Sequence, residues 1–234
     1  MAKKGGDKKM KRHKAPKTMH LLRKEKKFAL SPEVGPHSKE RSVPLGYILR
    51  DCLKVASNAV EAKKVLNDGK VRINGIVRKS LRFPVGLFDF VSVDGLSHEY
   101  RMLFDAKGRL YPEKIDKKSV ERIRPSKIIR KTIEKKGRIK LTTDNGNNYI
   151  VEGKLASDAK PNDTLLIKIP EDEIKELKKM EVGAKVYITA GPHVSKQAVI
   201  SSIKPSTAKS GKVVVIKQGS NEFETTVKNV VVIE

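Results

Sequence analysis

Residues 69–78 read GKVRINGIVR, and their local conformation follows from residue type. Asn74-Gly75 lies between two short runs in which apolar and basic residues alternate, which is the strongest short-range signal for a two-residue β-hairpin. Gly69 stands where a helix commonly ends in a left-handed residue. The stretch therefore predicts a helix that ends at Gly69 and a hairpin that follows directly.

The residues before the hairpin predict two short helices. Apolar residues recur at helical spacing over residues 45–56. Asn58 and Glu61 then have the spacing of a capping box at the start of a second helix. A strand near Phe90–Val93 completes the unit. The sequence thus predicts a compact α+β module over residues 41–105.

Beyond residue 100 the chain reads almost entirely as short strands separated by turn residues. The candidate strands are Tyr100–Phe104, Lys127–Ile133, Arg138–Thr142, Asn148–Val151, Thr164–Ile169, Val186–Thr189, Ala198–Ile203, Lys212–Ile216, Phe223–Val227 and Val230–Ile233. The charged segment Glu171–Lys179 fits either a short helix or a returning strand. Short β units of this kind suggest small barrels. We expect a central β domain over residues 106–180 and a second one over residues 181–234.

The charge of the chain is strongly positive and uneven. It holds 51 Lys and Arg against 27 Asp and Glu, a net charge of +24. Residues 1–30 alone hold 12 basic and two acidic residues. A polyanion is the partner that such a chain favours, because neutralised phosphates release condensed counterions. We interpret residues 1–40 as a basic extension and linker, and expect residues 1–30 to be disordered in isolation.

Composition narrows the class of protein further. Aromatic residues make up 5% of the chain and Trp is absent, which favours recognition of an RNA backbone over recognition built mainly on aromatic stacking. The single cysteine, Cys52, suits a reducing, cytoplasmic setting. No apolar stretch approaches the roughly 20 residues of a membrane span, so no membrane partner is expected.

No catalytic, metal or cofactor site is predicted. His13, His20, His37, His98 and His193 are scattered, and none has zinc-ligand spacing to another or to the cysteine. We interpret them as surface or turn histidines. The chain also lacks a phosphate-binding loop of the Walker type and a dinucleotide fingerprint, so no small-molecule substrate is indicated.

The candidate RNA-binding residues are basic side chains of the extension and of the module. Those of the extension are Lys3, Lys4, Lys8, Lys9, Lys11, Arg12, Lys14 and Lys17. Those of the module are Arg41, Lys63, Lys70, Arg72, Arg78, Lys79 and Arg82. The module residues come mostly from helix ends and hairpin edges. They could gather on one face that contacts phosphates and not base edges.

The helix–helix–hairpin unit resembles the S4-like RNA-binding module in Asn58-x-x-Glu61-Ala62 and in residues 69–75, with Ala59 where many such modules carry Arg. A wider resemblance, to the archaeal and eukaryotic small-subunit ribosomal protein S4e family, spans residues 11–233. The motifs that carry it are Lys11-Arg12, Gly35-Pro36-His37, Asp89–Asp94, Tyr100-Arg101, Phe104–Arg109, Asn162-Asp163-Thr164 and Phe223–Thr226. Gly183–Val186 with Ile188–Gly191 resembles a KOW module.

The resemblance implies a fold class and a function. The expected fold is a multidomain α+β protein with a basic N-terminal extension, a small α+β S4-like RNA-binding module, a central all-β barrel-like domain and a C-terminal SH3-like KOW barrel. The expected function is that of a structural constituent of the small (30S) ribosomal subunit. Its partners would be small-subunit ribosomal RNA and neighbouring ribosomal proteins.

Two other classes of protein remain as alternatives. RNA pseudouridine synthases often carry an S4-like module and a motif similar to Gly-Arg-Leu-Asp. Here Tyr111 follows Gly108-Arg109-Leu110 in place of the aspartate nucleophile. A KOW-type transcription elongation factor is the third class. Stable residence on ribosomes, and not on RNA polymerase, would exclude it.

Overall fold

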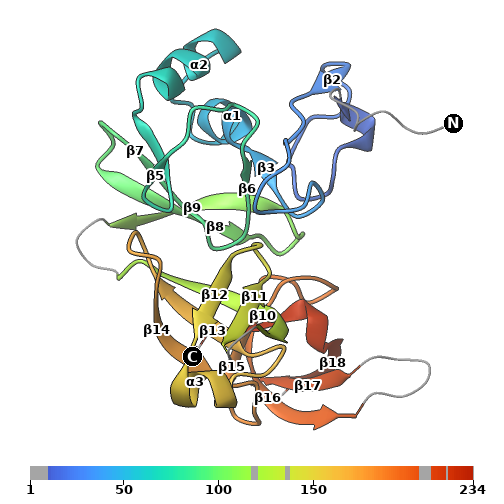
Figure 1. The fold of residues 1–234 in the computed structure, drawn as a ribbon. Helices are drawn as coiled ribbons and strands as arrows, with labels where there is room; N and C mark the ends of the chain where they lie inside the picture. Colours follow the sequence, from blue (N-terminus) through green and yellow to red (C-terminus); the bar gives the residue numbers. More distant parts are fainter. Residues whose placement is uncertain (1–9, 117–120, 135–137, 206–211, 220, 234) are drawn as a thin grey trace, which may run out of the picture. The chain divides into compact units, whose positions relative to one another are not determined.

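The structure of the chain is a computed structural model that describes residues 10–116, 121–134, 138–205, 212–219 and 221–233 (Figure 1). Strands dominate it and helices are few. The chain forms two compact units. The first contains residues 1–105 and 109–120, and the second contains residues 106–108 and 121–234.

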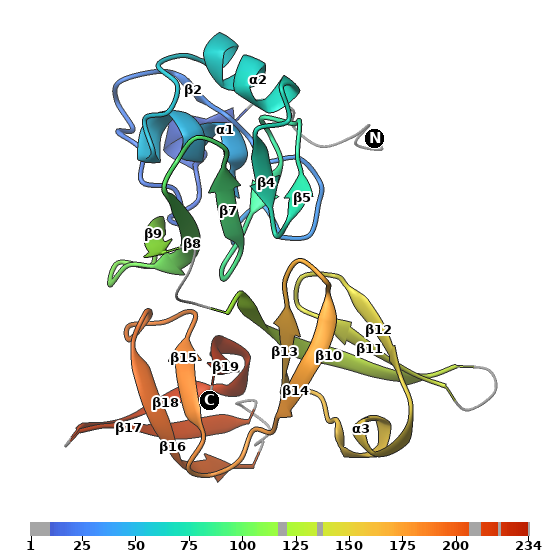
Figure 2. The same cartoon turned by 90° about the vertical axis from the view of Figure 1, so that its left-hand side faces the viewer.

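The first unit is built on an antiparallel sheet with the strand order β5-β4-β7-β8-β9. Its strands are β4 (Val71–Ile73), β5 (Ile76–Val77), β7 (Phe90–Val93), β8 (His98–Phe104) and β9 (Leu110–Asp116). A separate pair joins β3 (Val43–Pro44) to β6 (Pro84–Val85). The helices are α1 (Leu45–Tyr47), which continues as a π-helical turn over Ile48–Cys52, and α2 (Ala59–Asn67); α2 lies above α1 in Figure 2.

Local side-chain chemistry explains where α2 begins and ends. Asn58 Oδ1 accepts a hydrogen bond from the Glu61 backbone N–H at 2.9 Å, and Glu61 Oε2 accepts one from the Ser57 N–H at 2.7 Å. The first bond satisfies an N–H group that the first helical turn leaves free, and the second holds the residue before the N-cap against the helix. Gly69 has a φ of 73°, the left-handed conformation that ends a helix. The predicted cap and end of α2 are confirmed.

The Asn74-Gly75 hairpin is also confirmed. Asn74 and Gly75 have φ values of 52° and 82°, as a type I′ turn requires. The turn pairs Ile73 with Ile76. In β4 the side chains of Val71 and Ile73 are buried and that of Arg72 is exposed, so the strand directs a basic side chain outward.

Residues 10–30 correct one expectation. They fold into a small lobe in which β1 (Met10–Lys11) pairs with β2 (Phe28–Ala29), visible in blue beside α1 in Figure 1. Met10 and Met19 are buried, and the Tyr47 hydroxyl donates a hydrogen bond to the His20 carbonyl at 2.8 Å. The expected disorder is therefore wrong for residues 10–30, because their few apolar side chains are packed. Residues 1–9 lie outside the described part of the chain.

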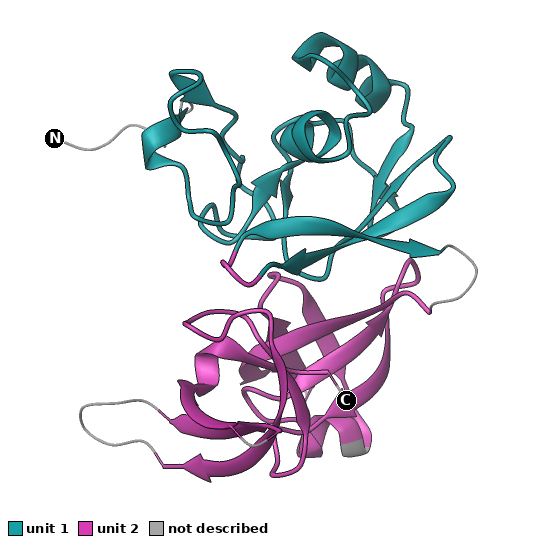
Figure 3. Cartoon of the chain, turned by 180° about the vertical axis from the view of Figure 1, so that it is seen from behind, with its two compact units in different colours: residues 1–105, 109–120 teal, residues 106–108, 121–234 magenta. Residues whose placement is uncertain are grey.

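The second unit contains two five-stranded antiparallel sheets (Figure 3). The first has the order β12-β11-β10-β13-β14, with β10 (Ile123–Ile133), β11 (Ile139–Thr143), β12 (Asn148–Val151), β13 (Thr164–Lys168) and β14 (Glu173–Lys178). The second has the order β18-β17-β16-β15-β19, with β15 (Lys185–Ile188), β16 (Gln197–Lys204), β17 (Val213–Gln218), β18 (Asn221–Thr226) and β19 (Val230–Val232). Every candidate strand predicted beyond residue 100 has a counterpart here or in β8.

In the second unit, one element was ambiguous in the sequence and one was missed. The segment Glu171–Lys179 forms the strand β14, not a helix. A short helix, α3 (Gly153–Asp158), follows β12 and was not expected.

Each sheet of the second unit buries its own apolar cluster. Ile128, Leu141 and Leu165 form the centre of the first, while Val186, Ile200 and Val214 form the centre of the second. The Lys127 side chain connects the two sheets. Its Nζ donates hydrogen bonds to the carbonyls of Val227 at 2.5 Å and Val230 at 2.8 Å.

Candidate nucleic-acid interface

The helix α2 and the hairpin hold exposed basic side chains. Lys63 lies on α2, Lys70 directly precedes β4, and Arg72 lies within β4. Lys70 pairs with Asp68 at 3.2 Å and Arg72 pairs with Asp94 at 3.1 Å, with all four side chains about half exposed. Exposed ion pairs are worth about 1 kcal/mol or less, so a phosphate could replace these carboxylates at little cost.

The remaining candidates of the module differ in exposure. Arg41 and Lys79 are exposed. Arg78 is half-buried, with its guanidinium 4.5 Å from the centre of the Phe83 ring. Arg82 Nε donates a hydrogen bond to the Ser31 carbonyl at 2.9 Å, which ties the linker to the module. Arg78 and Arg82 therefore contribute to packing and to internal hydrogen bonding as well as to the positive charge of the module.

The candidates of the extension divide in the same way. Lys11, Lys14 and Lys17 are exposed. The Arg12 side chain is only 6% exposed, and its Nη1 donates to the Leu22 carbonyl at 2.6 Å and to the Glu25 carboxylate at 2.9 Å. Arg12 thus joins two segments of the lobe of residues 10–30 and is not a free surface cation. The four other candidates, Lys3, Lys4, Lys8 and Lys9, lie outside the described residues.

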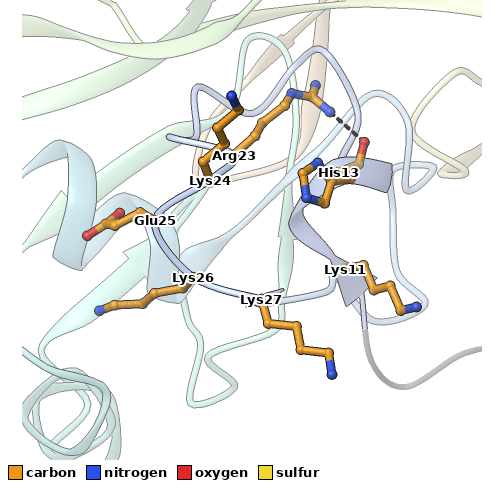
Figure 4. Close-up of a pocket in the computed structure, with 7 residues that line it drawn as sticks. All are labelled: Lys11, His13, Arg23, Lys24, Glu25, Lys26 and Lys27. Carbon is orange, nitrogen blue, oxygen red and sulfur yellow. Dashed lines mark hydrogen bonds between the residues drawn. The ribbon is translucent and has the colours of Figure 1, made fainter.

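A basic pocket of about 430 Å³ opens in the lobe formed by residues 10–30 (Figure 4). It is lined by Lys11, His13, Arg23, Lys24, Glu25, Lys26 and Lys27. Arg23 holds the pocket in shape, because its guanidinium donates to the carbonyls of His13 at 2.7 Å and Ala15 at 3.2 Å. Within residues 10–116, no ion pair engages the four lysines of this pocket.

Sequence reasoning missed four cations of this pocket. The candidate residues stopped at Lys17, yet the run Arg23-Lys24-Glu25-Lys26-Lys27 was visible in the sequence. The proximity of this run to Lys11 was not visible, because the two segments meet only in the folded lobe, through the β1–β2 pair and the hydrogen bonds of Arg12 and Arg23. The pocket was therefore missed because it depends on contacts between residues that are far apart in the sequence.

The histidines do not gather into a metal site. Among the described residues, no three His, Cys, Asp or Glu side chains could hold a metal ion together. His37 lies in a bend, as a turn histidine would, but not on the surface: its side chain is 12% exposed and its Nε2 lies 2.8 Å from the buried carboxylate of Asp89. Asp89 also accepts hydrogen bonds from the Gly86 N–H and the Asn74 side-chain amide, both at 2.8 Å. His37 therefore fastens the linker to the module.

The segment considered as an enzyme motif has a structural role. Gly108 and Arg109 belong to the connection between β8 and β9, and Leu110 begins β9; the Asp105 side chain accepts a hydrogen bond from the Arg109 N–H at 2.8 Å. Gly108 has a φ of 76°, which suits a turn. Tyr111 lies in β9 opposite Leu103 and is exposed. In the part of the chain that the structure describes, no helix is long and apolar enough to cross a membrane.

The fold and the basic surface define a protein built from an S4 domain and further modules. The S4 domain model matches residues 52–91, and the RS4NT (NUC023) domain model matches residues 4–40. The model of the ribosomal family S4e matches residues 96–174. Together with the relatives described next, these matches show that the chain belongs to the ribosomal S4e family.

Several relatives match over most of their length. The small ribosomal subunit protein eS4 of Methanococcus vannielii is 38% identical over 230 residues, which cover 96% of this chain and 93% of that protein. The eS4 protein of Methanocaldococcus jannaschii is 44% identical over 209 residues, or 87% of this chain and 84% of that protein. The crystal structure of the 30S ribosomal protein S4e from Thermoplasma acidophilum is similar with a TM-score of 0.70 and 32% identity, covering 83% of this chain and 96% of that one.

These relatives bear on the choice between protein classes. They are named as ribosomal proteins and not as enzymes. The prediction of a non-enzymatic protein is thereby confirmed, and neither the pseudouridine synthase nor the transcription factor gains support.

Proposed function

We propose that this chain is a structural constituent of the small ribosomal subunit, in which it binds ribosomal RNA and abuts neighbouring ribosomal proteins in the cytoplasm. The observation that carries this proposal is its similarity to eS4 proteins over nearly the whole chain. The net charge of +24 supports it, since a polyanion offsets the repulsion among these cations.

The RNA-binding surface that we propose has two parts. The first is the exposed basic side chains of the module, Arg41, Lys63, Lys70, Arg72 and Lys79. The second is the extension, including Lys11, Lys14, Lys17 and the basic pocket. Both parts consist of long, flexible cations, which suits recognition of the RNA backbone and shape.

We also propose the division into residues 1–40, 41–105, 106–180 and 181–234, with a KOW-type SH3-like barrel at the C-terminus. Two features support the barrel. The strands β15 to β18 form a meander, and β19 returns after the 3-10 turn Val227–Asn229 to pair with β15. A sheet whose last strand returns to its first is the arrangement that a small closed barrel needs.

Sedimentation tests the proposed function directly. The native protein should travel with small ribosomal subunits through a sucrose gradient at high salt, because many simultaneous phosphate contacts keep a component in place. A control gradient without subunits should leave the protein at the top. If it instead travels with RNA polymerase and is absent from small subunits, a transcription elongation factor becomes the correct class.

A further inference from the structure

A second hollow lies on β2, next to the basic pocket. It measures about 240 Å³ and shares Lys26 with the pocket. Apolar and aromatic side chains form much of its wall, among them Met19, Leu21, Phe28 and Tyr47. Met19 and Tyr47 are buried, whereas Phe28 is 46% exposed. The Phe28 ring thus leaves a flat apolar surface open to solvent beside this hollow.

The charges around the two hollows favour an anionic partner. Glu25 is the single acidic residue that lines the basic pocket, and Arg12 neutralises it at 2.9 Å. Figure 4 shows that Lys11 and Lys27 point in the same direction, while Glu25 points away from them. Lys27 Nζ lies 5.6 Å from the centre of the Phe28 ring. Lys27 of the cationic pocket and the flat, apolar ring of Phe28 are thus adjacent in the sequence and close in space.

A nucleotide combines the two chemistries that these hollows accept. Its phosphate requires cations, and its base requires a flat apolar surface such as an aromatic ring. In a duplex the bases are stacked and paired, so that only an unpaired base can turn toward a side chain. We propose that the lobe of residues 10–30 binds an unpaired RNA nucleotide, with its phosphate in the basic pocket and its base against Phe28. This inference rests on the proposed function and names the part of the RNA that this lobe recognises.

The test measures binding of the full chain to a short oligouridylate and to a short RNA duplex of equal nucleotide count. Replacing the ring in Phe28→Ala should weaken binding of the oligouridylate about tenfold, the loss expected for one stacked base. Binding of the duplex should not change. Phe28→Tyr keeps the ring and should bind as the wild type does. Leu22→Ala removes another exposed apolar side chain of the lobe and should have no effect.

A second pair of variants tests the phosphate. Changing Lys11, Lys24 and Lys27 together to Gln should flatten the dependence of log affinity on log salt by about 0.7 per lost contact with the single strand. The control removes the same charge from exposed lysines of the second unit: Lys196, Lys217 and Lys228. It should keep the wild-type slope.

Two outcomes would overturn the inference: wild-type binding of oligouridylate by Phe28→Ala, or equal loss of slope in both lysine variants. The proposed function is judged separately by sedimentation of the wild type with small subunits. A wild type that sediments with subunits while Phe28→Ala binds oligouridylate normally would leave the function standing and remove only the nucleotide site.

Discussion

Lys127 is a cation that the fold uses internally. It is 7% exposed, and its Nζ donates to the carbonyls of Val227, which begins the 3-10 turn, and Val230, which begins β19. A buried ammonium group is costly unless hydrogen bonds replace its water. The two carbonyls supply such bonds, so that this lysine stabilises the arrangement of the two sheets within the second unit. In a chain with 51 Lys and Arg, not every cation is available to an anionic partner.

Lys127→Met should lower the free energy of unfolding by about 1–3 kcal/mol, because the carbonyls of Val227 and Val230 lose a buried donor. Denaturant unfolding followed by circular dichroism measures the change. Lys217→Met is the matched control, since Lys217 is exposed on β17, and it should change the stability by less than about 0.5 kcal/mol. Equal midpoints for the two variants would show that the Lys127 bonds do not contribute.

Cys52 illustrates how burial controls a reactive group. Partial burial raises the pKa of its thiol from 9.0 to about 11, although the neighbouring Tyr47 hydroxyl acts in the opposite direction. The thiolate is the nucleophile, so a shift of two units lowers its population at pH 8 about a hundredfold. Alkylation by iodoacetamide should therefore be slow in the folded chain and fast in denaturant. Similar rates in both states would contradict the shift.

The raised pKa of Cys52 also predicts how the free energy of unfolding depends on pH. The neutral thiol is favoured in the folded state, so its contribution is fully present below pH 9. Between about pH 9 and 11 the unfolded thiol loses its proton while the folded one keeps it. Stability should decrease over this range, and Cys52→Ser should reduce that part of the decrease.

Among the elements, those with local signals were predicted well. The capping box at Asn58 and the Asn74-Gly75 turn each depend on residues within a few positions of one another, which sequence alone reveals. The strand β9 was missed because Pro112 interrupts its pattern and much of the strand is exposed. The β1–β2 pair was missed because each strand has two residues and their contact spans the whole lobe.

The basic side chains of α2 and β4 lead to a prediction about RNA affinity. The variant reverses four exposed cations to Glu: Lys63, Lys70, Arg72 and Lys79. Arg78 is left unchanged because it stacks on Phe83, so that its loss would also disturb packing. RNA binding should weaken on the order of tenfold or more at low salt, with thermal unfolding nearly unchanged. Filter binding with small-subunit ribosomal RNA provides the affinity.

The matched control reverses four exposed lysines of the second unit: Lys196, Lys212, Lys217 and Lys228. It carries the same change in net charge. If the two variants bind RNA equally well, the effect comes from overall charge and the surface of the module has no special role.

Over the whole chain, the sequence predicted the class of protein better than the site. Net charge, repeated short strands and the ordered family motifs indicated an RNA-binding ribosomal protein, since each is a property of composition or order. Which basic side chains are exposed and which form internal hydrogen bonds was not predictable from the sequence. Arg12, Arg82 and Lys127 are occupied by partners distant in the sequence, and such contacts exist only after folding.

This distinction changes how the extension should be tested. Removing residues 1–27 would also remove Met10 and Met19 from the core and the His20 carbonyl that accepts the Tyr47 hydroxyl. That deletion should lower the melting temperature, and any loss of RNA binding would have two causes. Removing residues 1–9 deletes four lysines and one aspartate and none of these contacts.

The shorter deletion should therefore leave thermal unfolding unchanged. The slope of log affinity for ribosomal RNA against log salt should decrease by about 0.7–0.9 for each phosphate contact that Lys3, Lys4, Lys8 and Lys9 make. Changing these four lysines to Gln in the full chain should reproduce the effect, because it removes the charge and keeps the length. An unchanged slope in both variants would limit the RNA contacts of the extension to the folded lobe of residues 10–30.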